Sequence, residues 1–375
     1  MKEEGGKRQT MSHLFEIWQT IQNTLFPWLE EVLDPLTEKE REFVQVVQLA
    51  EIQKHMGPYR WEGMGRKPED RLAIAKAFIA KAVYNCPTTK GLITLIRGSK
   101  NLRRLCGWER KEEIPSESTF SRAFESFSRG GLGQKIHEAM VKQHTGGKLV
   151  GHVTRDATAI EVREKPIRKE AKGPERKCKG KRGRPRQGEV RAFREPKRLE
   201  VQGGRSLAEN MADLPTQCDV GTKINAKGYK TSWIGYKLHI DSIDGDIPVS
   251  ALLSSASLHD SQAAIPLAQM TAERVTNLYD LMDSAYDAPQ IKAYCTALGH
   301  VPIIDSNPRR GEKQEMDPAQ AVRFKNRSTA ERVNSNLKDN YGGRFVRVRG
   351  AVKVMTHLMF GLIAITAIQL FRLLP

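Results

Sequence analysis

The first third of the chain carries apolar residues at helical spacing. Such residues recur every three or four positions over residues 14–25, and Pro27 is expected to end that helix. Thr37 and Glu40 have the spacing of a capping box, which predicts that a second helix begins there. Further helices are predicted over residues 70–84 and 89–97 and from Pro115 onwards. The pattern indicates an all-α domain over residues 1–145.

This region of short helices also carries several arginines: Arg103, Arg104, Arg110 and Arg122. Short helices joined by tight turns permit a helix-turn-helix reader of DNA. The same pattern suits a plain helical packing domain about equally well. Binding of DNA ends by this domain is therefore a hypothesis.

The pattern changes at residue 149. Residues 149–154 alternate loosely and are rich in β-forming residues, which predicts a strand that ends at Asp156. Further strands are predicted over residues 233–240, 247–254, 278–282 and 301–304, with helices over 260–274, 289–298 and 328–340. Mixed strands and helices indicate an α/β domain over residues 146–375, in which helices cover a sheet.

A very basic segment interrupts this domain. Residues 163–198 hold sixteen Lys and Arg against five Glu, with several Gly and Pro. Such a segment has too few apolar residues to form a core. We therefore expect a basic insert at about 163–230 that is a loop or disordered.

Charge and cysteine content narrow the function classes. The 375 residues carry a formal net charge of +17, and a soluble protein with this excess commonly binds nucleic acid. Five scattered cysteines argue against a disulfide framework and against a cysteine zinc site. The apolar part of residues 354–374 is too short for a bilayer and is predicted as a buried helix. No signal peptide is visible, so a cytoplasmic location without membrane contact is expected.

Three acidic residues follow or begin predicted elements. Asp156 and Asp283 each come after an apolar strand, and Glu331 lies in the first turn of a helix that Ser328 or Thr329 is expected to cap. A strand end holds a carboxylate rigidly, which suits a metal ligand. An acid in a first helical turn is also explained by the helix dipole alone. Three such acids could bind two Mg²⁺ ions.

The stretch FKNRSTAERVNSNLK, residues 324–338, carries the strongest resemblance to a known family. Arg327, Glu331 and Lys338 stand at the spacing of a Y-x2-R-x3-E-x6-K signature, with Phe324 where tyrosine is usual. The chain is similar here to bacterial insertion-sequence transposases of the DDE superfamily, whose catalytic core is RNase H-like. The strings TRDATAIE, MDSAYDAP, GYKLHI and SLHDSQ also resemble these enzymes. The resemblance covers most of residues 110–370.

The resemblance implies a fold and a mechanism. The fold would be an RNase H-like mixed sheet flanked by helices. Asp156, Asp283 and Glu331 would be catalytic residues that hold two Mg²⁺ ions, with Mn²⁺ as an expected substitute. One ion would activate water or a DNA 3′-hydroxyl, and the other would stabilise the leaving 3′-oxygen. Arg327 and Lys338 would contact DNA phosphates near the cut.

The same resemblance implies partners and a location. The DNA would be double-stranded, as the terminal inverted repeats of the element and as target DNA. Family members pair two ends, so a dimer is expected in the DNA complex. The location would be the bacterial cytoplasm, in association with the nucleoid.

Two groups of arginines are further candidates for DNA contact. Arg182, Arg184 and Arg186 lie in the string KRGRPR, whose R-G-R-P core resembles a minor-groove AT-hook. A solvated basic linker explains that string too, and we favour nonspecific phosphate contact over base reading. Arg344, Arg347 and Arg349 alternate with apolar residues, and we expect them on one side of a strand.

Two other functions remain open from the sequence. A non-catalytic DNA-binding protein, either a repressor or a decayed transposase, would keep the basic surface, although the intact acid triad argues against decay. A metal-dependent nuclease on the same fold would hydrolyse DNA without joining it. Only an assay of joining separates such a nuclease from a transposase.

Overall fold

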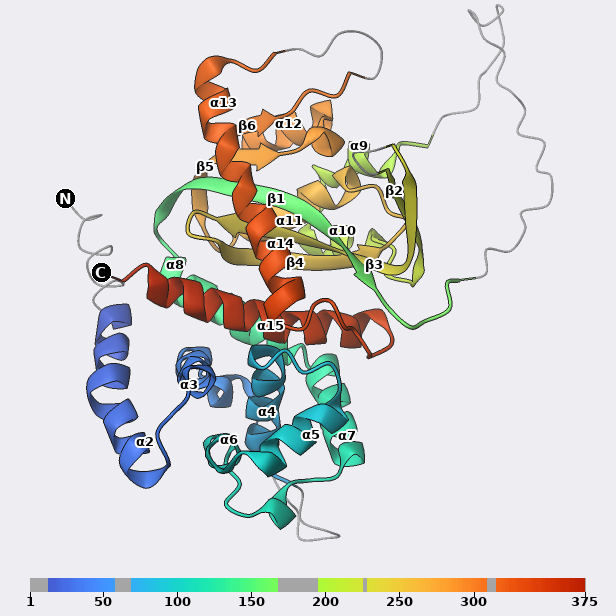
Figure 1. Ribbon diagram of the computed structural model, residues 1–375. Helices are drawn as coiled ribbons and strands as arrows, with labels where there is room; N and C mark the ends of the chain where they lie inside the picture. The colour runs from blue at the N-terminus through green and yellow to red at the C-terminus, as the bar shows by residue number, and fades with distance from the viewer. Residues whose placement is uncertain (1–12, 58–68, 168–194, 225–227, 309–314, 375) are drawn as a thin grey trace, which may run out of the picture.

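The structure is a computed structural model that describes residues 13–57, 69–167, 195–224, 228–308 and 315–374. A six-stranded mixed sheet lies between two layers of helices, and N-terminal helices pack beneath the lower layer (Figure 1). This arrangement confirms the expected α/β class, and it is consistent with an RNase H-like sheet preceded by a helical region.

The long strand β3 (Lys230–Ile243) organises one half of the sheet. Strand β1 (Leu149–Glu161) pairs antiparallel with β3 along one edge. Along its other edge β3 pairs first with β2 (Asp219–Ile224) and then with β4 (Ile247–Ser255), both antiparallel. Each of these strands was predicted except β2.

The other half of the sheet is parallel. Strand β5 (Thr276–Met282) pairs parallel with β1, and β6 (Val301–Ile304) pairs parallel with β5. Strand β1 is therefore central, with an antiparallel neighbour on one side and a parallel neighbour on the other. A central strand is fixed in register from both sides, which makes it a rigid support for side chains.

Each face of the sheet has its own helices. Helix α11 (Ser261–Ala272) covers one face, and α9 (Arg198–Gln202), α10 (Leu207–Asp213) and α12 (Pro289–Ala297) pack against it. The opposite face carries α14 (Ser328–Asn340), α15 (Ala351–Arg372) and α8 (Leu132–Thr145).

Helix α15 joins the two parts of the molecule. It contacts β4 on one side and, on the other, the N-terminal helices α3 (Glu38–Ala50), α4 (Arg71–Val83) and α7 (Glu117–Arg129). A single cluster of buried apolar side chains includes residues from both parts of the molecule, from Leu14 in the N-terminal helices to Phe371 in α15. Helix α15 is long and apolar enough to cross a membrane, but 83% of its most apolar window is buried, as expected for a core helix.

The first helix does not end at Pro27, contrary to prediction. A π-helical turn at Ile21–Leu25 leads directly into α2 (Phe26–Val32), which has Pro27 in its first turn. The π turn bonds the amide of Phe26 to the carbonyl of Ile21, which shifts the hydrogen-bond ladder before the proline ring enters it. A proline in the first turn then has no helical hydrogen bond to lose. The capping box of Thr37 and Glu40 is confirmed at the start of α3.

The expected loop or disordered insert at about 163–230 is wrong for its second half. Residues 198–224 form α9, α10 and β2. A capping box of Ser206 and Glu209 begins α10. The Asn210 amide then donates to the carbonyl of Gln202 and to the side chain of Gln269, both at 2.9 Å. These bonds hold α9, α10 and α11 together. The S-x-x-E spacing of Ser206 and Glu209 could have predicted the start of α10 from the sequence.

A buried ion pair fixes β1 to β3 on the α11 face. Arg155, which is 1% exposed, donates from Nε and Nη2 to the two carboxylate oxygens of Asp241 at 2.8 and 2.6 Å. Thr271 on α11 donates to the same carboxylate at 2.7 Å. Because Arg155 and Asp241 are direct cross-strand partners, the pair holds the register of the central strand.

We predict that Arg155→Met lowers the free energy of unfolding by about 3–5 kcal/mol, because Asp241 would be left as an uncompensated buried charge. Denaturant unfolding followed by circular dichroism measures this loss. Arg129→Met, which breaks the exposed pair of Arg129 with Glu125, is the control and should cost about 1 kcal/mol or less. Equal losses in the two variants would show that the buried pair has no special role.

Candidate active site

Two of the predicted acids stand side by side on the sheet. The parallel register of β1 and β5 ends with Arg155 opposite Met282, and the next position on each strand is Asp156 and Asp283. Adjacent strands are about 4.8 Å apart, so the two carboxylates share one neighbourhood. Both lie on the face opposite Arg155, because side chains alternate along a strand.

Each aspartate is held in a different way. Asp283 follows the last residue of β5 and caps a 3-10 turn, where its Oδ1 accepts from the amide of Ala285 at 2.9 Å. Asp156 lies in the middle of β1, which continues to Glu161. The prediction that the strand ends at Asp156 is therefore wrong, because β3 pairs with β1 as far as Glu161.

Burial makes ionisation of both aspartates unfavourable. Burial, together with the nearby charge of Asp283, raises the pKa of Asp156 to about 6. Burial likewise raises the pKa of Asp283. The positive charges of Arg327 and Lys223 act in the opposite direction on both carboxyls. The pair thus carries unbalanced negative charge at neutral pH, which a bound cation would neutralise.

Helix α14 brings the third acid to the same face of the sheet. Glu331 lies in its first turn, as predicted, but its side chain is 58% exposed and forms an ion pair with Arg327 at 2.5 Å. Within the described ranges, no three His, Cys, Asp or Glu side chains lie close enough together to hold a metal ion. The structure therefore brings Asp156 and Asp283 together and leaves Glu331 turned towards Arg327.

Asn334 reaches the acids from α14, one turn after Glu331. Its Nδ2 donates to Oδ2 of Asp156 at 2.9 Å. Its Oδ1 is buried and has no hydrogen-bond partner in the described part of the chain. Residues three apart on a helix share a face, so Glu331 and Asn334 both face β1 from the same helix. Sequence analysis missed Asn334, because an asparagine in a helix carries no signal of its own.

The donor set fits a divalent cation. Two adjacent carboxylates and one amide oxygen without a partner are the hard oxygen ligands that Mg²⁺ and Mn²⁺ prefer. Asp156, Asp283 and Asn334 are the residues in place, and Glu331 is one helical turn away on the same face. A buried oxygen without a partner is costly unless something binds it, which supports this reading.

The segment before α14 begins differently from the prediction. Ser328 and Thr329 do not cap the helix; instead α13 (Pro318–Phe324) and a 3-10 turn at Lys325–Arg327 lead into it. The hydroxyls of Ser328 and Thr329 accept from the guanidinium of Arg332 at 2.7 and 3.0 Å. No cap is needed because the preceding turns supply the hydrogen-bond partners.

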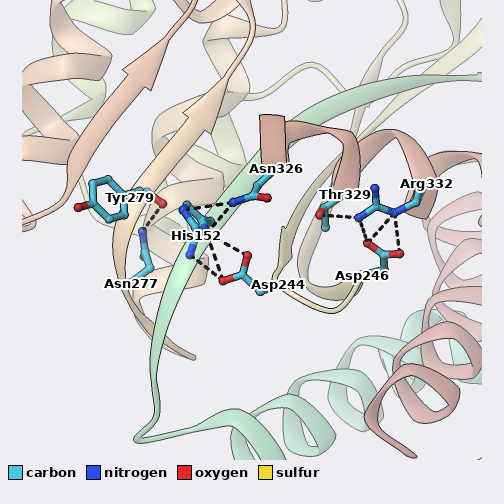
Figure 2. Close-up of polar contacts among 8 residues, drawn as sticks. All are labelled: His152, Asp244, Asp246, Asn277, Tyr279, Asn326, Thr329 and Arg332. Atoms are coloured by element: carbon cyan, nitrogen blue, oxygen red, sulfur yellow. Dashed lines mark hydrogen bonds and ion pairs between the residues drawn. The ribbon is translucent and has the colours of Figure 1, made fainter. Parts of the chain in front are cut away.

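A single turn of the sheet holds this helical segment against β1 (Figure 2). In the β3–β4 turn, Asp246 binds Arg332 of α14 through both carboxylate oxygens, at 2.7 to 3.0 Å. Asp244 of the same turn binds Nδ1 of His152 on β1 at 3.0 Å, and Asn326 contacts that imidazole from above. The two aspartates therefore fix the backbone on which Glu331 and Asn334 stand.

The predicted signature residues meet in part. The guanidinium of Arg327 lies 5.9 Å from the ring centre of Phe324, so the phenyl ring supports the arginine without a hydroxyl. Lys338 is half-buried, and burial lowers its pKa. The charge of Lys223 on β2 lowers the pKa values of Asp156, Asp283 and Lys338. Sequence analysis missed Lys223 because the insert was expected to lack structure.

Two further motif strings are joined beside the site. Lys237 of GYKLHI donates to Asp260 of SLHDSQ at 2.8 Å and to the carbonyl of Leu258 at 2.8 Å. Asp260 in turn adds to the charge that raises the pKa of Asp283. The two strings thus position the loop that follows β4 against the second aspartate.

The other predicted DNA contacts have mixed outcomes. Arg344, Arg347 and Arg349 lie in residues 343–350, which form no strand, contrary to prediction. All three are exposed, and Arg344 pairs with Asp339. Chain reversal between α14 and α15 leaves this segment without a neighbouring strand. Arg182, Arg184 and Arg186 lie outside the described residues.

Comparison with family models gives two matches. Residues 29–126 match the model described as Transposase domain (DUF772). Residues 153–367, more than half of the chain, match the model described as Transposase DDE domain. No curated protein and no solved structure matches the chain.

We predict that Asp156→Asn raises the melting temperature in EDTA at pH 7.5, by roughly one to three degrees. The folded state raises the pKa of Asp156, so its ionised form opposes folding above pH 6, and the gain should shrink as pH falls through 6. With Mn²⁺ the wild-type protein should gain stability and Asp156→Asn should not. Differential scanning fluorimetry measures both effects, with Glu31→Gln, an exposed acid on α2, as the control. Equal stabilisation of the wild type and of Asp156→Asn by Mn²⁺ would show that the cation does not bind at Asp156.

Proposed function

Because the chain belongs to the family of insertion-sequence DDE transposases, as the match over residues 153–367 shows, we propose that Asp156, Asp283 and Glu331 catalyse its DNA cleavage and strand transfer. The observation that carries this proposal is the adjacency of Asp156 and Asp283 on parallel strands beneath α14. Family members generally use divalent metal ions, and two Mg²⁺ ions, or Mn²⁺ in their place, suit this donor set.

Asp156 and Asp283 would hold the ions. Asn334 would orient Asp156 through Nδ2, and its Oδ1, which has no partner among the described residues, would be a further ligand. When bound, the ions supply Lewis-acid activation of the attacking hydroxyl and stabilise the leaving oxygen. The residues of the chain set the geometry: Asp283 is fixed by the amide of Ala285, and Asp156 by β1 and by Asn334. A fixed carboxylate pair loses little freedom when it takes up a cation, which favours tight positioning of the phosphate.

In this proposal, Glu331 would join them by rotation of its side chain. Its pair with Arg327 is exposed, and such pairs contribute about 1 kcal/mol or less. A DNA phosphate is a stronger partner for the planar guanidinium than this carboxylate. Phosphate binding to Arg327 would therefore release Glu331 towards the two aspartates. In this proposal, binding of DNA completes the metal site.

A cationic surface beside the acids would hold the DNA backbone. Arg327 and Lys223 lie close enough to affect both aspartates electrostatically, and Lys338 follows on the same helix face. Arg344, Arg347 and Arg349 continue this surface beyond α14. Arg182, Arg184 and Arg186 of the basic insert would add nonspecific phosphate contacts.

The helical region over residues 1–145 would bind the DNA ends, and residues 146–375 would form the catalytic domain. The substrates would be double-stranded terminal inverted repeats and target DNA. A dimer would hold two ends together, in the bacterial cytoplasm at the nucleoid. Crosslinking of the DNA complex tests the dimer directly.

We predict that Asp156→Asn, Asp283→Asn and Glu331→Gln each reduce strand cleavage by at least about 1,000-fold, as expected for the loss of a metal ligand. DNA binding by each variant should stay within about twofold of the wild-type affinity. Labelled terminal-repeat DNA in a cleavage and joining assay with Mg²⁺ measures both steps. Asp317→Asn, at the start of α13, is the control acid. Full cleavage by any of the three variants would refute the role of that residue; cleavage without joining would make the protein a nuclease.

We predict that Asn334→Ala weakens Mn²⁺ binding by about 10–100-fold, because Asp156 would lose its orienting donor. Isothermal titration in the absence of DNA measures this binding without relying on activity. Asn336→Ala is the matched control, since Asn336 lies on the same helix and its side chain bonds only Asn340 among the described residues. Unchanged Mn²⁺ affinity in Asn334→Ala would exclude Asn334 from the site.

A further inference from the structure

A largely buried lysine in the N-terminal helices has no partner for its charge among the described residues. Lys81 on α4 is 7% exposed, and no hydrogen bond or ion pair joins its ammonium group to another described residue. Burial lowers its pKa to about 8. A charge in such a position is costly unless an ion binds it, so its presence calls for an explanation.

Lys81 lines a cavity of about 260 Å³ where four parts of the chain meet. The walls come from α4, from the first turn of α5 (Thr89–Gly98), from α7 and from the segment that contains Arg347. His357 of α15 closes the base, and its Nε2 is engaged by the carbonyl of Gly342 at 2.9 Å. Burial lowers the pKa of His357 to about 3, so it is neutral and adds no charge.

The polar part of the remaining lining is suited to an anion, whereas Phe78, Pro87, Phe124 and Val348 make the rest apolar. The first turn of α5, after its cap Thr88, presents backbone amides and the positive end of the helix dipole. Arg347 is exposed at the cavity and has no ion pair within the described ranges. Ser121 of α7 adds a hydroxyl. Glu117, also on α7, is the one acid in the lining and is exposed to solvent.

We propose that this cavity binds a phosphate of the DNA backbone through Lys81, Arg347 and the first turn of α5. The proposal rests on the proposed function, because DNA is the ligand. The choice of DNA over free phosphate follows from continuity: Lys338 lies within electrostatic range of both Lys223 and Arg344, and Arg347 stands three residues after Arg344 in the segment between α14 and α15. DNA lying on the catalytic acids and on these residues would reach the cavity next.

The test compares DNA affinity and its salt dependence for wild type and Lys81→Met. Fluorescence anisotropy with terminal-repeat DNA in EDTA keeps metal chemistry out of the measurement. We expect about tenfold weaker binding for Lys81→Met, and a slope of log K against log salt that is shallower by about one. Lys76→Met is the matched control, since Lys76 lies on the same helix and lines a different cavity. It should leave both quantities unchanged.

Protein stability separates this proposal from a structural role of Lys81. If Lys81 awaits DNA, Lys81→Met should raise the melting temperature at pH 7 in phosphate-free buffer, because an unbalanced buried charge is removed. If Lys81 pairs with Glu117 in solution instead, both Lys81→Met and Glu117→Gln should lower the melting temperature, which would overturn the proposal.

Two further outcomes decide against it. Unchanged DNA affinity and slope in Lys81→Met would exclude DNA phosphate from the cavity. If millimolar inorganic phosphate also stabilised wild type but not this variant, the cavity would be a site for free phosphate instead. If the wild-type protein binds no DNA at all, the proposed function itself is contradicted. If the wild-type protein binds DNA and Lys81→Met binds it equally well, only the proposal for this cavity is contradicted.

Discussion

The bidentate pair of Arg155 with Asp241 is the constraint on which the site depends. It ties the central strand to its antiparallel neighbour on the face covered by α11, within a fully buried setting. Strand alternation then turns the next residue, Asp156, to the opposite face. A shift of β1 by one residue would place Arg155 on the side of α14 and remove Asp156 from Asp283. The register that buries the cation is thus the register that brings the two carboxylates together.

The opposite face is organised by charge that the fold does not balance. Burial and mutual repulsion raise the pKa of Asp156, and among the described residues the charges of Arg327 and Lys223 offset this only in part. Stability would be greater with neutral residues there, which is the usual relation between an active site and the fold that carries it. The site tolerates this cost because the strands and the β3–β4 turn hold the acids in place. A cation bound between the two aspartates would neutralise their negative charge.

Much of the fold could be predicted from periodicity, whereas the state of the site could not. From residue 230 onwards most strand and helix positions followed the hydrophobic pattern, since burial on a sheet or helix face repeats with a fixed period. The exceptions are α13, which was not predicted, and the strand expected at residues 344–349, which does not form. Pro27 misled because a π turn is a matter of hydrogen-bond register that sequence does not reveal. The prediction of an unstructured insert failed for residues 198–224 because it was based on the high charge of the segment, and the capping box at Ser206 was overlooked. Asp156 and Asp283 stood out beside strands, but their shared face depends on pairing between β1 and β5. The roles of Asn334 and Lys81 depend on tertiary contacts alone, so no local pattern announces them.

Helix α14 carries residues with different relations to the same chemistry. Asn334 bonds Asp156, Glu331 is paired with Arg327, and Arg332 on the same helix is paired with Asp246. In the proposed mechanism, loss of that ion pair and rotation of the Glu331 side chain would bring its carboxylate to the aspartates. An exposed ion pair is weak and sensitive to competing anions. The backbone of DNA is such an anion, and it would arrive along the surface that runs from Lys338 to Arg347. In the proposed mechanism, access of the substrate and completion of the acid cluster would therefore be coupled through Arg327.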